Sequence, residues 1–251
     1  MDKEMKNVVL VIVLCIVSSF AIKAQDLYVV SIGIADYAFI NDLRYTENDV
    51  KSFNSVMKRH TKNIISLTGK NATHYNVVRS IETVFSKAKK EDRVILFFSG
   101  HGYPGGFCCY DMNPKGRKNG LTYQELQILF RKCKSKYKII FADACFSGGV
   151  RIRGNSNEIS ESQIQQSNVL FFLSSRTNET SQEMIQGENG QFTRFLVRGL
   201  GGGADYNRDK LVTAKELFDF VSKGVKIATY EKQHPVMWGK YDDNMTILNW
   251  N

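Results

Sequence analysis

A histidine and a cysteine each follow an apolar run of this chain, and together they could act as a base and a nucleophile. One run covers residues 93–100 and stops at His101, and the other covers residues 138–144 and stops at Cys145. Both runs have the length and composition of buried strands, and parallel strands carry their active residues at their carboxyl ends. An imidazole and a thiol 44 positions apart in the chain can therefore lie side by side, as nucleophilic catalysis requires.

The residues around this pair are compatible with acyl transfer. A free thiol is mostly protonated at neutral pH, so an imidazole must take its proton and later pass it to a leaving amine. Gly102 permits close approach of a substrate backbone, and the backbone N–H groups of Gly102 and Cys145 are candidates to hold a developing oxyanion. The alternative is that Cys145 is a small buried hydrophobe and His101 a structural histidine. Their joint position at two strand ends favours catalysis.

Strands and helices alternate along most of the chain. Apolar runs predict strands at residues 27–34, 64–67, 93–100, 138–144, 169–173 and 235–238. Helical spacing and capping patterns predict helices around residues 50–57, 78–88, 122–130, 192–199 and 213–228. This order predicts one three-layer α/β/α sandwich with a mostly parallel central sheet of about six strands. Two segments are expected outside it: a loop or small hairpin at residues 102–118 and a long exposed loop at residues 148–167.

The first 24 residues have the pattern of a secretory signal peptide. Lysines precede a nearly continuous apolar stretch at residues 8–22, and Ala24 offers a small residue before Gln25. We therefore expect a signal peptide at residues 1–24 and one domain at residues 25–251. The protein is expected to be exported, periplasmic or secreted, with no stable membrane insertion after cleavage. The apolar stretch is short for a spanning helix, and an uncleaved N-terminal anchor is the alternative.

Charge and cysteine content exclude several classes of protein. The formal net charge is +9, and about +8 remains without residues 1–24. The basic residues are scattered and do not alternate with aromatic ones, so no nucleic-acid partner is expected, although a basic surface can attract acidic polymers. The four cysteines after residue 24 have no framework spacing and no CxxC pair. Neither a disulfide scaffold nor a zinc site is therefore expected.

Two motifs resemble the signatures of caspase-like cysteine peptidases. They read S-G-H-G at residues 99–102 and D-A-C-F-S-G at residues 143–148. The second is similar to the D-x-C-x-S-G of the bacterial metacaspase-like branch of peptidase family C14, in clan CD. The resemblance covers residues 25–251 in element order. It implies that Cys145 is the nucleophile and His101 the general acid and base, with no strong third member of a triad.

Two acidic residues are candidates for substrate recognition. Residues two apart in a strand point to one face, so Asp143 is expected near the thiol, where an anion opposes thiolate formation. Asp49 matches a second acidic position of the metacaspase-like pocket. The resemblance thus implies that Asp49 and Asp143 bind Arg or Lys before the cut. The ordinary alternatives are a helix-start charge for Asp49 and a strand-end acceptor for Asp143. Family residues after the next strand also shape the pocket, and here that region contains Ser174, Ser175 and Glu183.

The sequence therefore predicts a cysteine endopeptidase that hydrolyses peptide or protein substrates after Arg or Lys. In the family, the loop after the nucleophile can be cut, and Arg151 and Arg153 suit self-cleavage within residues 148–167. An uncut surface loop is the alternative. Two other classes stay open: a non-catalytic binding or scaffold module of the same fold, and a transpeptidase that forms the same thioester. The sequence makes no prediction of the oligomeric state.

One segment fits a twelve-residue calcium loop in part. Position 6 is Lys210, where the sharp turn favours glycine. The oxygen donors of residues 205–216 include Asp205, Asn207, Asp209 and Glu216. The competing interpretation is that Asp and Asn make the turn while Thr213 and Glu216 cap the next helix. Calcium is the one cofactor left open; no organic cofactor and no other metal is expected.

Overall fold

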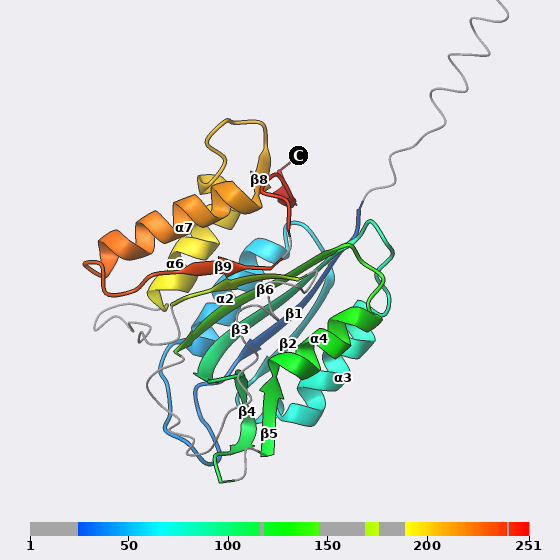
Figure 1. Ribbon diagram of the computed structural model, residues 1–251, viewed down its shortest axis with the longest axis vertical. Coiled ribbons are helices and arrows are strands. Elements are labelled where there is room, and N and C mark those ends of the chain that lie inside the picture. The colour runs from blue at the N-terminus through cyan, green and yellow to red at the C-terminus, as the bar shows by residue number, and fades with distance from the viewer. Residues whose placement is uncertain (1–24, 116–117, 146–168, 176–188, 240, 251) are drawn as a thin grey trace, which may run out of the picture.

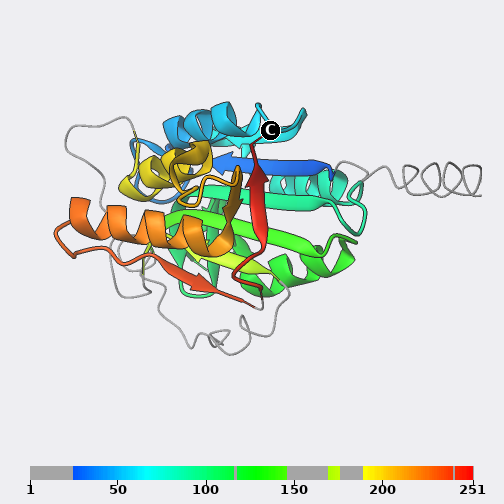
Figure 2. The ribbon, with the colours of Figure 1, turned by 90° about the horizontal axis from the view of Figure 1, so that it is seen from above.

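A twisted sheet runs through the middle of the molecule, with helices on both of its faces (Figures 1 and 2). The computed structural model describes residues 25–115, 118–145, 169–175, 189–239 and 241–250. The main path of the sheet has the strand order β2-β1-β3-β6-β7-β9. These strands are β2 (Asn63–Thr68), β1 (Leu27–Gly33), β3 (Arg93–Tyr103), β6 (Tyr137–Cys145), β7 (Leu170–Leu173) and β9 (Val236–Trp238).

Five of these strands are parallel, and the edge strand β9 pairs with β7 in the antiparallel sense. One face of the sheet carries α2 (Thr46–Met57), α6 (Gln191–Arg198) and α7 (Ala214–Ala228). The other carries α3 (His74–Phe85) and α4 (Tyr123–Lys132). The predicted three-layer α/β/α sandwich, with a mostly parallel sheet of about six strands, is confirmed.

The central strands β1, β3 and β6 are largely apolar because both faces of the sheet are covered. Val30, Leu96 and Ile140 lie opposite one another in β1, β3 and β6, and they pack on the face that carries α3 and α4. The preceding residue in each strand points to the opposite face, so Val29, Ile95 and Ile139 pack on the face that carries α2, α6 and α7. Apolar side chains of both faces are therefore buried in the central part of this strand pair.

The two predicted capping boxes have different outcomes. At the start of α7, the Thr213 hydroxyl accepts the Glu216 N–H, and the Glu216 carboxylate accepts the Thr213 N–H, so the box is complete. At the start of α4, Thr122 accepts the Glu125 N–H at 3.0 Å. The Glu125 carboxylate instead contacts Nε2 of His74 at 2.8 Å, which links α4 to α3.

The structure differs from the expected elements at the end of β3 and in a small second sheet. The expectation that the first motif strand ends at residue 100 is wrong, because β3 continues to Tyr103 and pairs there with β4 (Gly106–Asn113). The expected hairpin after it is confirmed as β4 and β5 (Lys118–Thr122). A two-stranded sheet of β8 (Leu211–Thr213) and β10 (Thr246–Asn249) was not predicted. Two short helical turns complete the order, η1 (Gly69–Asn71) and η2 (Gly199–Gly203).

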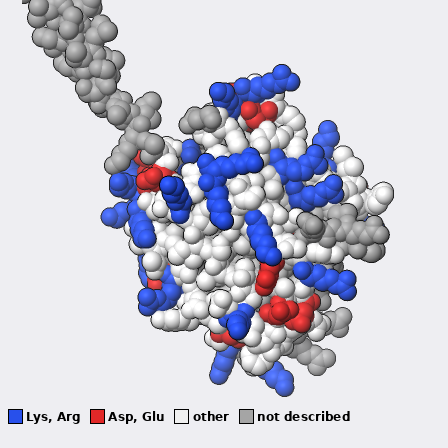
Figure 3. All heavy atoms as spheres, turned by 180° about the vertical axis from the view of Figure 1, so that it is seen from behind, with Lys and Arg blue, Asp and Glu red and all other residues white. Residues whose placement is uncertain are grey.

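The signal-peptide and loop predictions fall on residues 1–24 and 148–167, which lie outside the described residues, and they stay predictions. Within the described ranges, no helix combines the length and the apolar character needed to cross a membrane. Lys and Arg side chains are spread over the face seen in Figure 3, with few Asp or Glu among them. The charge is scattered on this face, as the sequence suggested.

Candidate active site

The carboxyl ends of β3 and β6 bring His101 and Cys145 together. The ladder between the two strands begins with Arg93 opposite Tyr137 and ends with His101 opposite Cys145. Neighbouring strands lie about 4.8 Å apart, so the two backbones are adjacent at this point. Cys145 is the last residue of β6, and its side chain lies outside the description. His101 lies inside β3 rather than after it, because the strand continues into its pairing with β4.

His101 is held by the segment that follows β1. Its Nε2 lies 2.8 Å from the carbonyl oxygen of Asn41. A carbonyl only accepts hydrogen bonds, so Nε2 carries a proton, and Nδ1 is the basic nitrogen of the neutral ring. The His101 backbone N–H donates to the Tyr37 hydroxyl at 2.8 Å, and the two rings are 5.1 Å apart. His101 is 6% exposed, so the orientation of its ring is fixed by contacts on several sides.

The glycines of the first motif make room for this arrangement. A Cβ atom on Gly100 would lie 2.5 Å from the Tyr37 hydroxyl, so a larger residue would displace the group that binds the His101 N–H. Gly102 is buried and lies opposite Phe107 in the β3–β4 pair, one residue beyond the last pairing with β6. The expected oxyanion role of the Gly102 and Cys145 N–H groups stays a prediction.

The residue before Cys145 is fixed from β7. The buried Ser174 hydroxyl accepts the Ala144 N–H and donates to the Ala144 carbonyl, both at 3.1 Å. The Ser174 carbonyl in turn accepts the side-chain amide of Gln233, a fully buried residue just before β9. Ser174 therefore positions the backbone that leads into Cys145. Ser175 is also buried, and Glu183 lies outside the described residues.

Asp49 and Asp143 are brought together under the start of α6. Asp143 Oδ2 accepts both the N–H and the hydroxyl of Thr193, at 3.1 and 2.8 Å. Asp49 accepts the Ser99 hydroxyl at 2.7 Å and the Gly190 N–H at 3.0 Å. A Cβ atom on Gly190 would lie 2.5 Å from Asp143 Oδ2 and 3.5 Å from Asp49 Oδ2. Both carboxylates thus border the same small volume beside Gly190.

The two carboxylates are almost completely withdrawn from water, with 2% of Asp49 and 8% of Asp143 exposed. Burial, followed by the repulsion from Asp143, raises the pKa of Asp49 from 3.8 to about 7. Hydrogen bonds from Ser99, Asn189 and Gly190 oppose this rise but do not cancel it. A cation placed beside the pair would relieve the repulsion and favour the ionised form.

Three other cysteines are poor nucleophiles. Cys108, Cys109 and Cys133 are free and buried. Burial raises the pKa of Cys108 to about 12, and it raises the pKa of Cys109 and Cys133 as well. Their thiols stay protonated at neutral pH, and only the thiolate attacks carbonyl carbon efficiently. These residues pack as small apolar side chains instead.

Sequence reasoning missed several residues that build the site. Ser99 was quoted only as part of a motif, yet its hydroxyl binds Asp49. Asn189 and Thr193 bind the two carboxylates from the start of α6, and no pattern in their own segment identifies them. The Asn41 carbonyl acts through the backbone, so its residue type carries no signal. A buried aspartate pair does imply hydrogen-bond donors somewhere in the fold.

The partial calcium loop is organised by its own backbone. Asp205 accepts the Asp209 and Lys210 N–H groups, and Glu216 serves the capping box of α7. Among the described residues, no group of three or more His, Cys, Asp or Glu side chains is arranged to hold a metal ion. The carboxylates of this loop therefore do not fit a cation site in the present arrangement. Calcium binding stays a prediction.

Comparisons with known proteins bear on the whole described chain. The family model of the caspase domain matches residues 28–245. A crystal structure of a protein from Geobacter sulfurreducens is similar, with a TM-score of 0.63 and 19% identity, covering 87% of this chain and 95% of that chain. The structure of pro-sf-caspase-1 has a TM-score of 0.62 and 14% identity, covering 89% and 94%.

At these identities, the likeness to the two solved structures shows the fold alone. The comparison with curated proteins gives no match. The match to the family model spans most of the chain and includes both motifs. The chain therefore belongs to the caspase-domain family of cysteine peptidases, peptidase family C14.

Proposed function

We propose that this protein is a cysteine endopeptidase that cuts peptide bonds after Arg or Lys, with Cys145 as nucleophile and His101 as general acid and base. The observation that carries the proposal is the terminal pairing of His101 with Cys145 in the β3–β6 ladder. Residues paired across parallel strands lie on the same side of the sheet, as a nucleophile and its base require.

The chemistry follows from the state of His101. Nδ1, the basic nitrogen, takes the thiol proton, and the resulting thiolate attacks the substrate carbonyl. The amine leaves as the imidazolium returns its proton, and a thioester remains on Cys145. Water activated by the neutral imidazole then hydrolyses the thioester. The Asn41 carbonyl supports this cycle because its hydrogen bond to Nε2 is retained in both protonation states of the ring.

The proposed specificity rests on Asp49 and Asp143. Asp143 lies two residues before Cys145 in β6, which is about 7 Å along an extended strand. That separation suits the side chain of the residue before the cut. A guanidinium or ammonium group beside the pair would neutralise a buried repulsion and displace the proton that the pair otherwise retains. Arg and Lys are therefore the substrate residues that this site favours.

The test compares reporter peptides that differ only in the residue before the cut: Arg, Lys, Asp or Ala. Wild-type protein is expected to cleave the Arg and Lys reporters, and Cys145→Ala and His101→Ala to lose at least about 10³-fold in kcat/KM. Cys133→Ala, which removes a buried thiol outside the site, is the matched control and should retain activity. Equal cleavage by wild type and Cys145→Ala would refute the proposal, and a preference for Asp would refute its specificity.

Self-cleavage within residues 148–167 is part of the same proposal, because Arg151 and Arg153 provide basic residues there. Wild-type protein should yield fragments ending at these residues, and Cys145→Ala should not. Identical fragments in both preparations would refute self-cleavage.

The scaffold alternative predicts no labelling of Cys145 by a thiol-directed peptide probe. The transpeptidase alternative predicts new amide products when amine nucleophiles are added.

A further inference from the structure

A large hollow lies at the amino ends of β3 and β6, at the opposite end of these strands from His101 and Cys145. Its volume is about 760 Å³, within the range of small-molecule sites. The ladder of β3 against β6 spans nine residue pairs, so this hollow and the candidate active site are about 26 Å apart along the strands. No step of the proposed peptidase reaction uses it.

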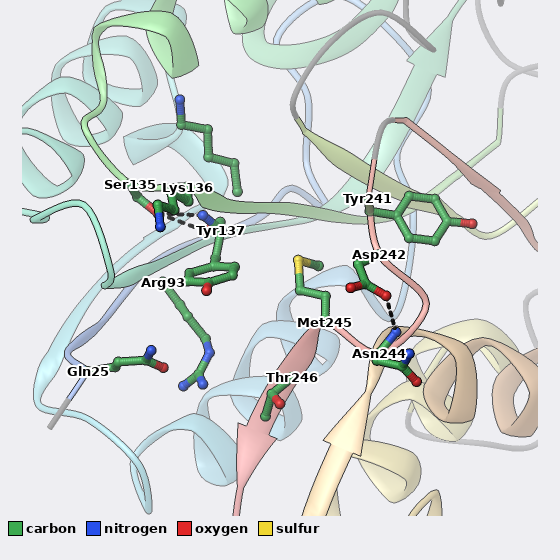
Figure 4. Close-up of a pocket in the computed structure, with 11 residues that line it drawn as sticks. Gln25, Arg93, Ser135, Lys136, Tyr137, Tyr241, Asp242, Asn244, Met245 and Thr246 are labelled. Atoms are coloured by element: carbon green, nitrogen blue, oxygen red, sulfur yellow. Dashed lines mark hydrogen bonds between the residues drawn. The ribbon is translucent and has the colours of Figure 1, made fainter. Parts of the chain in front are cut away.

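Cationic groups line this hollow from the strand starts. Arg93, Lys136 and Lys138 contribute to the wall, and Asp242 is the one acidic residue among the lining residues. Figure 4 shows Arg93 and Tyr137 on one side of the space and Met245 and Thr246 of the C-terminal segment on the other. The hollow is therefore formed by two strand starts and by the segment that leads into β10.

Two of these cations have no anionic partner in the described part of the chain. Lys136 pairs with Glu91 at 2.8 Å. Arg93 and Lys138 are half-buried, and no described carboxylate lies within 4 Å of either side-chain charge. Burial lowers the pKa of both groups, which shows that water solvates them incompletely. A partly desolvated cation without a counter-ion is costly, and an anion at this place would offset the cost.

The remaining walls determine what kind of anion fits. Tyr137 and Tyr241 contribute aromatic rings, Met245 contributes an apolar surface, and Gln25 and Asn244 contribute amides. Asp242 accepts the Asn244 N–H, so its carboxylate is engaged in the turn rather than with the two cations. Aromatic and apolar walls around a few convergent charged groups are typical of sites for small organic molecules.

We infer that this hollow binds a small organic oxyanion, a phosphate or a carboxylate joined to a planar or apolar part. Arg93 offers a planar fork of donors that matches either kind of oxyanion. Lys138 lies opposite Val94, one residue further along the strand pair, so its side chain points to the other face of the sheet and does not meet Arg93. Tyr137, Tyr241 and Met245 contact the remainder of the ligand. The site is independent of the peptidase reaction, so each stands without the other.

The test uses the full-length protein and three probes: phenyl phosphate, phenylacetate and inorganic phosphate. Binding is measured by calorimetry at low ionic strength, since screening weakens exposed charge contacts. At least one aromatic anion should bind, and should bind more tightly than inorganic phosphate. Phenyl phosphate and phenylacetate share a ring, so their relative affinity identifies the preferred oxyanion. Absence of binding by all three probes would overturn the inference, and equal affinity for inorganic phosphate would overturn its aromatic part.

Variants separate a built site from general surface charge. Arg93→Gln should weaken binding at least about tenfold. The matched control, Arg208→Gln, removes the same charge from an exposed residue outside the hollow and should change the affinity less than about twofold. Equal weakening in both variants would refute the site. Arg93→Lys keeps the charge but loses the donor fork, so it should bind more weakly than wild type and more tightly than Arg93→Gln. Thermal unfolding of every variant confirms that it is folded.

Discussion

The two ends of the β3–β6 strand pair carry charges of opposite sign, which are buried at the carboxyl end and half-buried at the amino end, and their surroundings differ. At the carboxyl end, Asp49 and Asp143 are surrounded by hydrogen-bond donors from β3 and α6. At the amino end, Arg93 lines an open hollow, and no described carboxylate lies within 4 Å of its guanidinium group. The acidic end is therefore organised by the protein itself, whereas at the basic end the proposed anion would complete the site.

The largest expected effect comes from removing charge at the acidic end. Asp143→Asn can keep its bonds from Thr193 but loses the charge that would pair with a substrate cation. We expect kcat/KM for an Arg reporter to fall about 10²- to 10³-fold, as for the loss of one partner of a buried charge pair. The activity on a citrulline reporter, the neutral isostere of Arg, should change little.

The control for this prediction is Asp219→Asn, which removes an exposed carboxylate paired with Lys215 on α7. It should leave both reporters unaffected. An unchanged ratio between Arg and citrulline reporters in Asp143→Asn would show that the acidic pair serves the structure of α6 and not substrate recognition.

Gly190 tests the space between the two carboxylates. Its φ of −59° and ψ of 149° suit alanine, so Gly190→Ala adds a methyl group without backbone strain. That methyl would press on Asp143 Oδ2, which two bonds from Thr193 hold in place. We expect the free energy of unfolding to fall by about 1–3 kcal/mol, measured by urea denaturation. The Arg-to-citrulline ratio should fall as well; an unchanged stability and ratio would mean that the volume beside Gly190 is free.

The main strands of the sheet could be predicted from the sequence better than the short strands and the contacts at the two ends. Two-sided burial makes β1, β3 and β6 largely apolar runs, so the strands and the adjacency of His101 and Cys145 could be deduced from composition and order. The pairing of β8 with β10 could not, because each strand is three or four residues long and lies far from its partner in the chain. Short strands carry too few residues for a periodic signal.

In the candidate site as well, some residues could be predicted from the sequence and others could not. Asp49 and Asp143 were identified as candidates, but their donors Asn189 and Thr193 depend on where α6 begins in space. The contact of His101 with the Asn41 carbonyl is made by the backbone and is invisible in residue types. The basic hollow was also missed, since Arg93 and Met245 line one space only when the C-terminal segment returns to the strand starts.

The pH dependence of stability tests whether the Asp49 carboxyl group holds its proton more tightly in the folded protein. Its pKa is about 7 in the folded protein and near 3.8 in an unperturbed chain, so the folded state holds the proton more tightly. The stability it contributes is complete below about pH 4 and is lost as the pH rises to about 7. Asp49→Asn has no such loss. Its free energy of unfolding should exceed that of wild type by at least about 1.4 kcal/mol at about pH 8, with a smaller excess at about pH 5. Urea denaturation at both pH values measures the difference, and a constant excess would contradict the raised pKa.

The smallest effect is expected at the basic end. Arg93→Gln with Lys138→Gln removes two cations that have no described carboxylate partner, so no ion pair is broken. In a buffer without phosphate or carboxylate anions, the free energy of unfolding should rise slightly or change by less than about 0.5 kcal/mol. A loss of several kcal/mol would mean that these cations stabilise the fold itself.

Adding an anion that binds the hollow should raise the stability of wild type with ligand concentration and leave the double variant unchanged. The same addition should not affect the pH profile set by Asp49, because the two ends are about 26 Å apart along the strands.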